Sequence, residues 1–144
     1  MGPEQEEQRA DSVADLAFTK AERLARVREA ESRQALALIA GFVKDARASG
    51  VAPTRLRARS YGGDARYRSN IEGWYIRKDR SVGVGTDGRF YVLSTPTSLS
   101  ARVTGVILKP SDPPMELGRG ARDGESIPLP DALKKRLDAG NTYP

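Results

Sequence analysis

Alternating apolar and polar residues over residues 73–94 form the clearest pattern in the chain. Asp87-Gly88 separates two of the alternating runs, and such a pair between such runs is a strong signal for a β-hairpin. We therefore predict a three-stranded antiparallel meander over this segment. Residues 54–61 alternate between arginines and less polar residues, which predicts one more strand with its arginines facing solvent.

The pattern leaves two registers open for the hairpin. A two-residue turn pairs Gly85 with Phe90, whereas a three-residue loop over 86–88 moves the register by one and places Tyr91 over the glycines. Either register leaves one face of the sheet without side chains at Gly83 and Gly85. We expect the long helix to pack closely against this bare face. A groove for a ligand or a peptide is the alternative.

A helical pattern precedes the strands. Residues 12–48 contain no proline and are rich in alanine, leucine, glutamate and arginine, which favour helix. We predict a helix over 11–49 that ends at Gly50, preceded by a disordered acidic tail at residues 1–10. A continuous helix over 13–48 would be ~54 Å long, against a radius of gyration of ~13 Å for the folded remainder. The helix must therefore overhang the rest or break near residues 31–32.

The last third of the chain predicts smaller elements. Residues 102–108 and 115–117 are expected as strands, and residues 131–139 as a short helix that ends at Gly140. The fold class is α+β: a long N-terminal helix packed on an antiparallel β-meander of four to six strands, with a short C-terminal helix. We expect a single domain in which residues 50–144 hold the sheet and the short helix.

Composition restricts the chemistry. The 144 residues include no cysteine and no histidine, which excludes disulfides, thiolate or imidazole metal sites and a Ser-His-Asp triad. The carboxylates show no pattern that would bring two of them together. We therefore expect no cofactor, no metal and no catalytic residues. The acidic N-terminus does not resemble a secretory signal, and the longest apolar run is too short to span a bilayer. We expect a cytoplasmic protein without a membrane partner.

The formal net charge of +5 is localised. Residues 51–100 hold nine basic against four acidic residues and so carry the whole excess. Basic and aromatic residues alternate here as they do on nucleic-acid-binding surfaces. A loop at 118–124 combines glycines with arginines, but its spacing fits a surface loop better than a phosphate-binding motif. The candidate anion or nucleic-acid contacts are Arg55, Arg57, Arg59, Arg77, Lys78 and Arg80.

The apolar stripe of the predicted helix suggests a function in binding. An overhanging stripe needs a partner, and a second copy of the chain is the simplest one. We expect a non-catalytic protein-interaction or self-association module, with a nucleic-acid-binding module that uses the basic-aromatic segment 55–80 as the alternative. An enzyme without histidine, cysteine or metal is a third hypothesis. The candidate helix interface consists of Leu16, Leu24, Val27, Leu38, Ile39 and Phe42.

Overall fold

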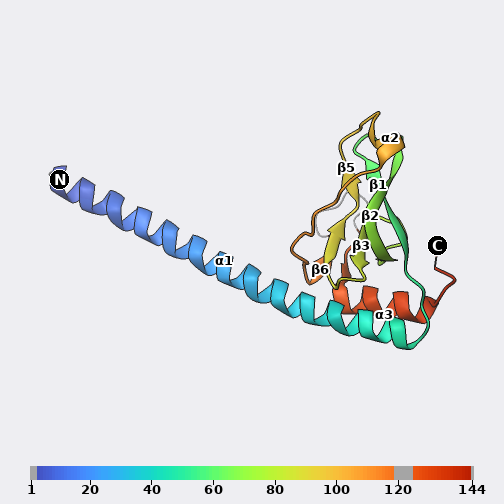
Figure 1. Ribbon diagram of the computed structural model, residues 1–144. Coiled ribbons are helices and arrows are strands. Elements are labelled where there is room, and N and C mark those ends of the chain that lie inside the picture. Colours follow the sequence, from blue (N-terminus) through green and yellow to red (C-terminus); the bar gives the residue numbers. More distant parts are fainter. Residues whose placement is uncertain (1–2, 119–124, 144) are drawn as a thin grey trace.

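One long helix projects far beyond a small head (Figure 1). The structure is a computed structural model that describes residues 3–118 and 125–143. Helix α1 runs without interruption over Pro3–Ala48. It therefore does not break near residues 31–32, and the overhanging alternative is the one that the structure shows. Residues 3–10, expected as a disordered tail, form the first turns of this helix, because acidic side chains near a helix N-terminus favour its positive end.

The C-terminal end of α1 is closed by two backbone hydrogen bonds. The Val51 N–H donates to the carbonyl of Ala46 at 2.9 Å, and the Gly50 N–H donates to that of Arg47 at 3.3 Å. Gly50 has a φ of 73°, a conformation that glycine adopts without strain. This arrangement is the Schellman motif, and it confirms the predicted end of the helix at Gly50.

The head is built around a mixed five-stranded sheet of order β4-β3-β2-β1-β5. The meander β1-β2-β3-β4 is antiparallel as predicted, whereas β1 and β5 pair in parallel. β4 and β5 lie at opposite edges of the sheet, yet only Leu93 separates them in the chain. Its N–H donates to the Ser81 carbonyl at 2.9 Å, and its own carbonyl accepts the Arg59 N–H at 3.0 Å. The sheet thus curls until its edges meet at Leu93. The strands are β1 Thr54–Ser60, β2 Arg66–Tyr75, β3 Val82–Gly85, β4 Phe90–Val92 and β5 Ser94–Thr95.

The β3-β4 hairpin takes the three-residue alternative. Val84 pairs with Phe90 and Gly83 with Tyr91. The Gly85 N–H donates to the Arg89 carbonyl at 3.0 Å, which leaves residues 86–88 as the loop. Gly88 has a φ of 77°, as the last position of such a loop requires.

The chain after β5 departs from one prediction. Residues 102–108 do not form the expected strand, since a short helix, α2 (Ala101–Thr104), occupies its first half. Gly105 ends this helix with a φ of 77°, and Val106 makes only a single bridge to Ser69 of β2. Apolar residues at this spacing fit a strand and a helical turn equally well, so the pattern alone could not distinguish them.

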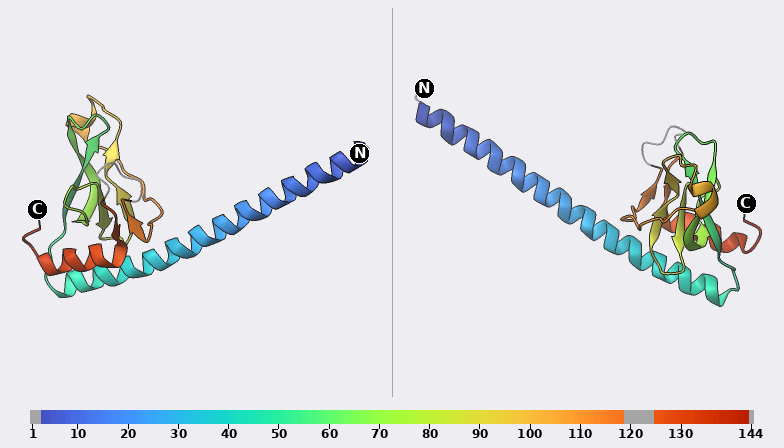
Figure 2. Two further views of the ribbon diagram at one scale, coloured as in Figure 1. Left: turned by 180° about the vertical axis from the view of Figure 1, so that it is seen from behind. Right: turned by 45° about the horizontal axis from the view of Figure 1, so that its top comes forward.

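Short elements complete the head. β6 (Glu116–Leu117) pairs with β7 (Ile127–Pro128), and α3 (Leu129–Ala139) follows at once. The predicted C-terminal helix is thereby confirmed. Both views in Figure 2 show α3 lying alongside the C-terminal part of α1.

Two apolar clusters lie on opposite faces of the sheet. The larger one joins the sheet to α1 and α3, and its aromatic centre is an edge-to-face contact of Phe42 with Trp74 at 5.5 Å between ring centroids. The Trp74 indole N–H donates to the Val51 carbonyl at 3.0 Å, so this ring belongs to the core. The smaller cluster, on the glycine face, consists of Leu56, Ile71, Tyr91 and Leu93.

Candidate interaction surface on the long helix

Helix α1 consists of two parts with different surroundings. Every residue from 3 to 30 is exposed, and we call this part the exposed half. Residues 31–48, the docked half, pack against the head. Leu24 and Val27 in the exposed half are 56% and 62% exposed, although burying such side chains is worth about 1.5–3 kcal/mol each. The large apolar side chains left exposed in this half are Val13, Leu16, Phe18, Leu24 and Val27.

Three of the five large apolar residues of the exposed half follow one stripe, together with two alanines and a lysine. Successive members are alternately three and four residues apart, which is the spacing of a helix-pairing seam. Ala17 and Leu24 precede the docked Ala35 and Phe42 by eighteen residues, or five helical turns, so both pairs lie on the same side of α1. The stripe therefore continues the face that binds the head. The stripe consists of Ala10, Val13, Ala17, Lys20, Leu24 and Val27.

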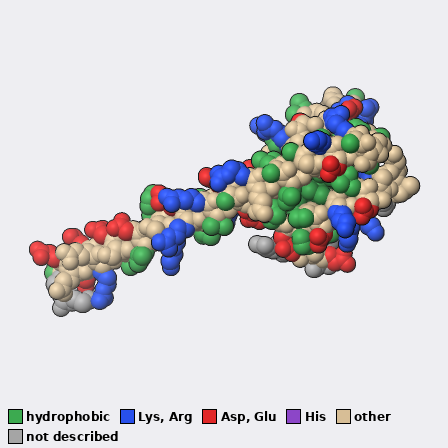
Figure 3. Space-filling model, turned by 90° about the horizontal axis from the view of Figure 1, so that it is seen from below, with side chains coloured by type: hydrophobic (Ala, Val, Ile, Leu, Met, Phe, Trp, Pro, Cys, Tyr) green, Lys and Arg blue, Asp and Glu red, His purple; other side chains and the backbone are tan. Residues whose placement is uncertain are grey.

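Charge is segregated along the exposed half. Residues 3–15 hold five acidic residues and one basic residue, a net charge of −4. Residues 16–30 hold four basic and two acidic residues, a net charge of +2. Figure 3 shows the acidic side chains gathered towards the free end of the helix, with apolar patches between the charges. The helix thus carries two segments of opposite charge, each of which could attract the other segment of a second copy.

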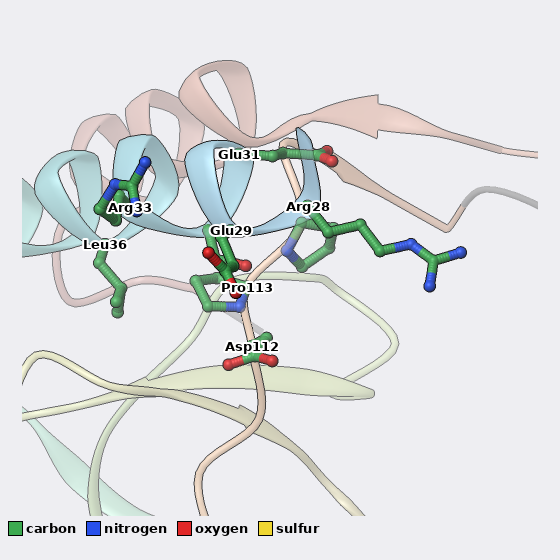
Figure 4. A pocket seen from close by; sticks show the side chains of 9 residues that line it. Arg28, Glu29, Glu31, Arg33, Leu36, Asp112 and Pro113 are labelled. Atoms are coloured by element: carbon green, nitrogen blue, oxygen red, sulfur yellow. The ribbon is translucent and has the colours of Figure 1, made fainter. Parts of the chain in front are cut away.

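A hollow marks the point where the exposed half meets the head (Figure 4). Arg28, Arg33 and Leu36 of α1 line one side, and Asp112 and the two following prolines line the other. Glu31 fixes the junction, because its Oε1 accepts the Met115 N–H at 3.0 Å. The lining thus holds two arginines and three carboxylates, those of Glu29, Glu31 and Asp112, directly beyond the end of the apolar stripe.

The predicted helix interface divides at this junction. Leu16, Leu24 and Val27 are exposed, whereas Ile39 and Phe42 are buried in the core of the head. Leu38 is partly buried against the same core. The last three residues thus bind the head and are not available to another molecule. The prediction omitted Val13, which its spacing to Ala17 and Lys20 would have identified, and Phe18, which lies off the stripe.

The predicted arginine row forms, with additional members. Arg57 and Arg59 of β1 are exposed and lie directly opposite Arg68 and Arg66 of β2. Among the described residues no carboxylate forms a salt bridge within 4.0 Å with these four, although Arg59 is close enough to Asp79 to contribute to the lowered pKa of that carboxyl. Arg55 differs, because its Nη2 lies 3.2 Å from Glu72 Oε1. We call Arg57, Arg59, Arg66 and Arg68 the arginine ladder.

Two of the three cations predicted at the first meander turn make contacts within the head. Arg77 donates to the Glu125 carbonyl at 3.2 Å and lies 3.8 Å from Asp79 Oδ1. The guanidinium of Arg80 lies 5.2 Å from the centre of the Tyr75 ring, while Lys78 is exposed. Arg77 and Arg80 line a hollow together with Arg59 of the ladder.

The bare glycine face is neither a groove nor the site where the helix docks. A Cβ atom at Gly83 would lie 2.8 Å from Leu56 Cδ1, and one at Gly85 would lie 3.1 Å from the Tyr91 ring. Side chains of the curled sheet therefore fill this face, and α1 packs on the other one. The Tyr91 hydroxyl donates to Asp87 Oδ2 at 2.6 Å. Burial and this hydrogen bond raise the pKa of Tyr91 to about 12.

Comparisons of the chain with protein-family models, curated proteins and solved structures find no match. Within residues 3–118 and 125–143, no group of histidine, cysteine or carboxylate side chains could hold a metal ion. No helix in the described ranges is long and apolar enough to cross a membrane. The glycine-arginine loop at 118–124 lies outside the described residues, apart from Gly118.

Proposed function

We propose that this protein is a non-catalytic self-association module, in which the exposed half of α1 pairs with the same segment of a second copy. The observation that carries the proposal is the apolar stripe that leaves the head and continues uncovered along the helix. The docked half shows that this side of α1 is suited to burial. A second α1 supplies a matching stripe at the required spacing.

Helix energetics support a partner for the exposed half. Its 28 residues would extend ~42 Å from the head at 1.5 Å per residue. Most of the stability of a helix in a protein comes from packing of its apolar face, and an isolated helix in water is marginal. Pairing two exposed halves covers both stripes at once and supports both helices.

Charge favours a second copy over an unrelated helix. The exposed half has one segment of net charge −4 and another of +2, so it is complementary to itself. An unrelated partner would need to reproduce this distribution. Complementary charge mainly determines specificity and orientation, while the apolar stripe supplies most of the affinity.

The test is to place a charge in the stripe. Leu24→Asp removes two buried leucines per dimer, which at about 1.5 kcal/mol each raises the dissociation constant about 100-fold. Thr19→Asp, on the polar side of the same helix, is the matched control and should leave the constant unchanged. Sedimentation equilibrium measures both. Equal effects of the two variants, or a wild-type protein that is monomeric at high concentration, would refute the proposal.

A second function, binding to the phosphate backbone of nucleic acids, is favoured by the arginine ladder. Like charges directly opposite each other on neighbouring strands destabilise a sheet, and a chain of phosphates would relieve this repulsion. Arg102 lines the same hollow as three ladder residues, and Tyr61, 73% exposed, offers a ring on which a base can stack. Arginine binds phosphate through two parallel hydrogen bonds, which suits it to this role.

Fluorescence anisotropy with a generic labelled oligonucleotide tests this second function. We expect binding at low salt that weakens steeply as salt rises, because each neutralised phosphate releases counterions. Arg57→Ser with Arg68→Ser should flatten the salt slope, whereas Arg26→Ser on α1 should not. Absence of binding at low salt, or equal loss in the Arg26 variant, would count against the ladder.

A further inference from the structure

We infer that the two copies pair antiparallel, with Val13 of one copy facing the partner's Leu24. This inference rests on the proposed self-association and adds its orientation and register. Three observations support it: the order of residues within the stripe, the distribution of charge, and the point at which the head begins.

The stripe itself suits an antiparallel pair. Its members occupy two seam positions of a heptad, with Ala10, Ala17 and Leu24 at the first and Val13, Lys20 and Val27 at the second. Antiparallel helices place the first position of one chain against the second position of the other. The facing layers are then Ala10 with the partner's Val27, Val13 with the partner's Leu24, and Ala17 with the partner's Lys20. Each layer combines a larger side chain with a smaller or similar one, as close packing requires.

A parallel pair in register is opposed by two like-charge contacts and by the repulsion between two like-charged segments. It would place Lys20 against the partner's Lys20 within the seam. Beside the seam it would bring Arg23 close to the partner's Arg28, and it would hold the two segments of net charge −4 together. Like charges at such positions destabilise helix pairs and select against the arrangement.

The antiparallel pair removes these contacts and adds one between opposite charges. Lys20 meets Ala17, so its long stem can cover the alanine while the ammonium group reaches water. Glu7 lies opposite the partner's Arg28, next to the seam. The segment of net charge −4 then lies along the partner's segment of net charge +2.

The position of the head selects one register among the antiparallel ones. In the proposed register, Pro3 lies beside the partner's Gln34, so the helix ends within the first turn of the docked half, just before its first fully buried residue, Ala35. A slide of one heptad in one direction would push the N-terminus into the head. A slide in the other direction would place Leu24 and Val27 against Glu6 and Pro3, beyond the partner's stripe.

The proposed register brings the end of the partner helix to the hollow at the junction. Glu4 and Glu6 then approach a lining that holds Arg28 and Arg33 but also Glu29, Glu31 and Asp112. Glu6 comes close to the partner's Glu31, whose carboxylate already accepts the Met115 N–H. The junction therefore adds no net charge attraction to the pair, and the orientation rests on the stripe and on the two charged segments.

Disulfide cross-linking tests the orientation, since the natural chain contains no cysteine. The variants are Val13→Cys, Leu24→Cys and the double variant, each first confirmed as a dimer by light scattering under reducing conditions. A disulfide needs Cα atoms about 4.4–6.8 Å apart, and positions 13 and 24 of one helix are ~16 Å apart along its axis. The double variant therefore cannot cross-link within one chain.

We expect the double variant to form covalent dimers on mild oxidation at least ~10 times faster than either single variant, because only its cysteines face each other. Rapid cross-linking of Val13→Cys alone would show a parallel pair and overturn the inference. Dimers that cross-link in none of the variants would overturn the register. A monomeric wild-type protein would instead refute the proposed self-association itself. Failure of the orientation can therefore be distinguished from failure of the self-association.

Discussion

The docked and exposed halves of α1 share a pattern but not an environment. Ile39 and Phe42 are almost completely buried by the head, while Leu24 and Val27, on the same side of the same helix, are more than half exposed. The two halves differ because the head ends before the apolar stripe does. The comparison shows that helical periodicity identifies the side of a helix that is to be buried, and does not identify what buries it.

Alanines occupy comparable positions on the apolar side of both halves. Ala35 and Ala46 are fully buried and let the head approach the axis of the docked half closely. Ala10 and Ala17 occupy comparable positions in the exposed half, so a second helix can approach closely there too. Lys20 is the one charged member of the stripe, and the docked face among the described residues has no equivalent.

The largest expected difference between the halves is in the stability of the head. Phe42→Ala should lower the free energy of unfolding by about 3–5 kcal/mol, because it removes a buried ring packed on Trp74. Val27→Ala, studied below the concentration at which dimers form, should change it by less than about 0.5 kcal/mol. Urea unfolding followed by the fluorescence of Trp74, the only tryptophan, measures both. Equal losses would mean that the two halves are packed alike in the monomer.

A substitution at Lys20 makes the stripe uniformly apolar. Lys20→Leu should tighten the dimer about 10-fold, since a polar residue in the seam of a helix pair reduces its stability. Arg26→Leu adds the same side chain outside the stripe and should have little effect. Sedimentation equilibrium distinguishes the two. Equal tightening in both variants would indicate nonspecific association of apolar surface.

Salt gives the smallest expected effect, and its direction is informative. Raising the ionic strength from ~0.05 M to ~0.5 M should weaken an antiparallel dimer a few-fold, because it screens the attraction between oppositely charged segments. A parallel dimer should become tighter, since the same salt would screen repulsion. A dissociation constant measured at both ionic strengths therefore tests the charge argument without any mutation.

The sequence was sufficient for the main elements of the fold. The meander, the long helix with its end at Gly50 and the short C-terminal helix all followed from periodicity and from glycine positions. The hairpin register did not, because Asp87-Gly88 suits loops of two and three residues alike. The parallel pairing of β1 with β5 could not be predicted from the sequence either, since it depends on the curl of the sheet around Leu93.

The candidate surfaces were predicted less completely than the fold. Leu16, Leu24 and Val27 could be named as apolar members of a helix, but only the extent of the head separates them from the buried Ile39 and Phe42. Arg57 and Arg59 could be assigned to the solvent side of a strand. Their partners Arg66 and Arg68 required the register of β2, which a bulge shifts between Arg55 and Arg57. Long-range pairing of this kind leaves no local signal.

The mass of the wild-type protein in solution tests the central claim most directly. Light scattering over a range of concentrations should give twice the chain mass of 15.7 kDa at the higher concentrations, and the Leu24→Asp variant should give the single chain mass under the same conditions. A wild-type protein that remains at 15.7 kDa at every concentration would contradict the claim that the exposed half of α1 pairs with a second copy.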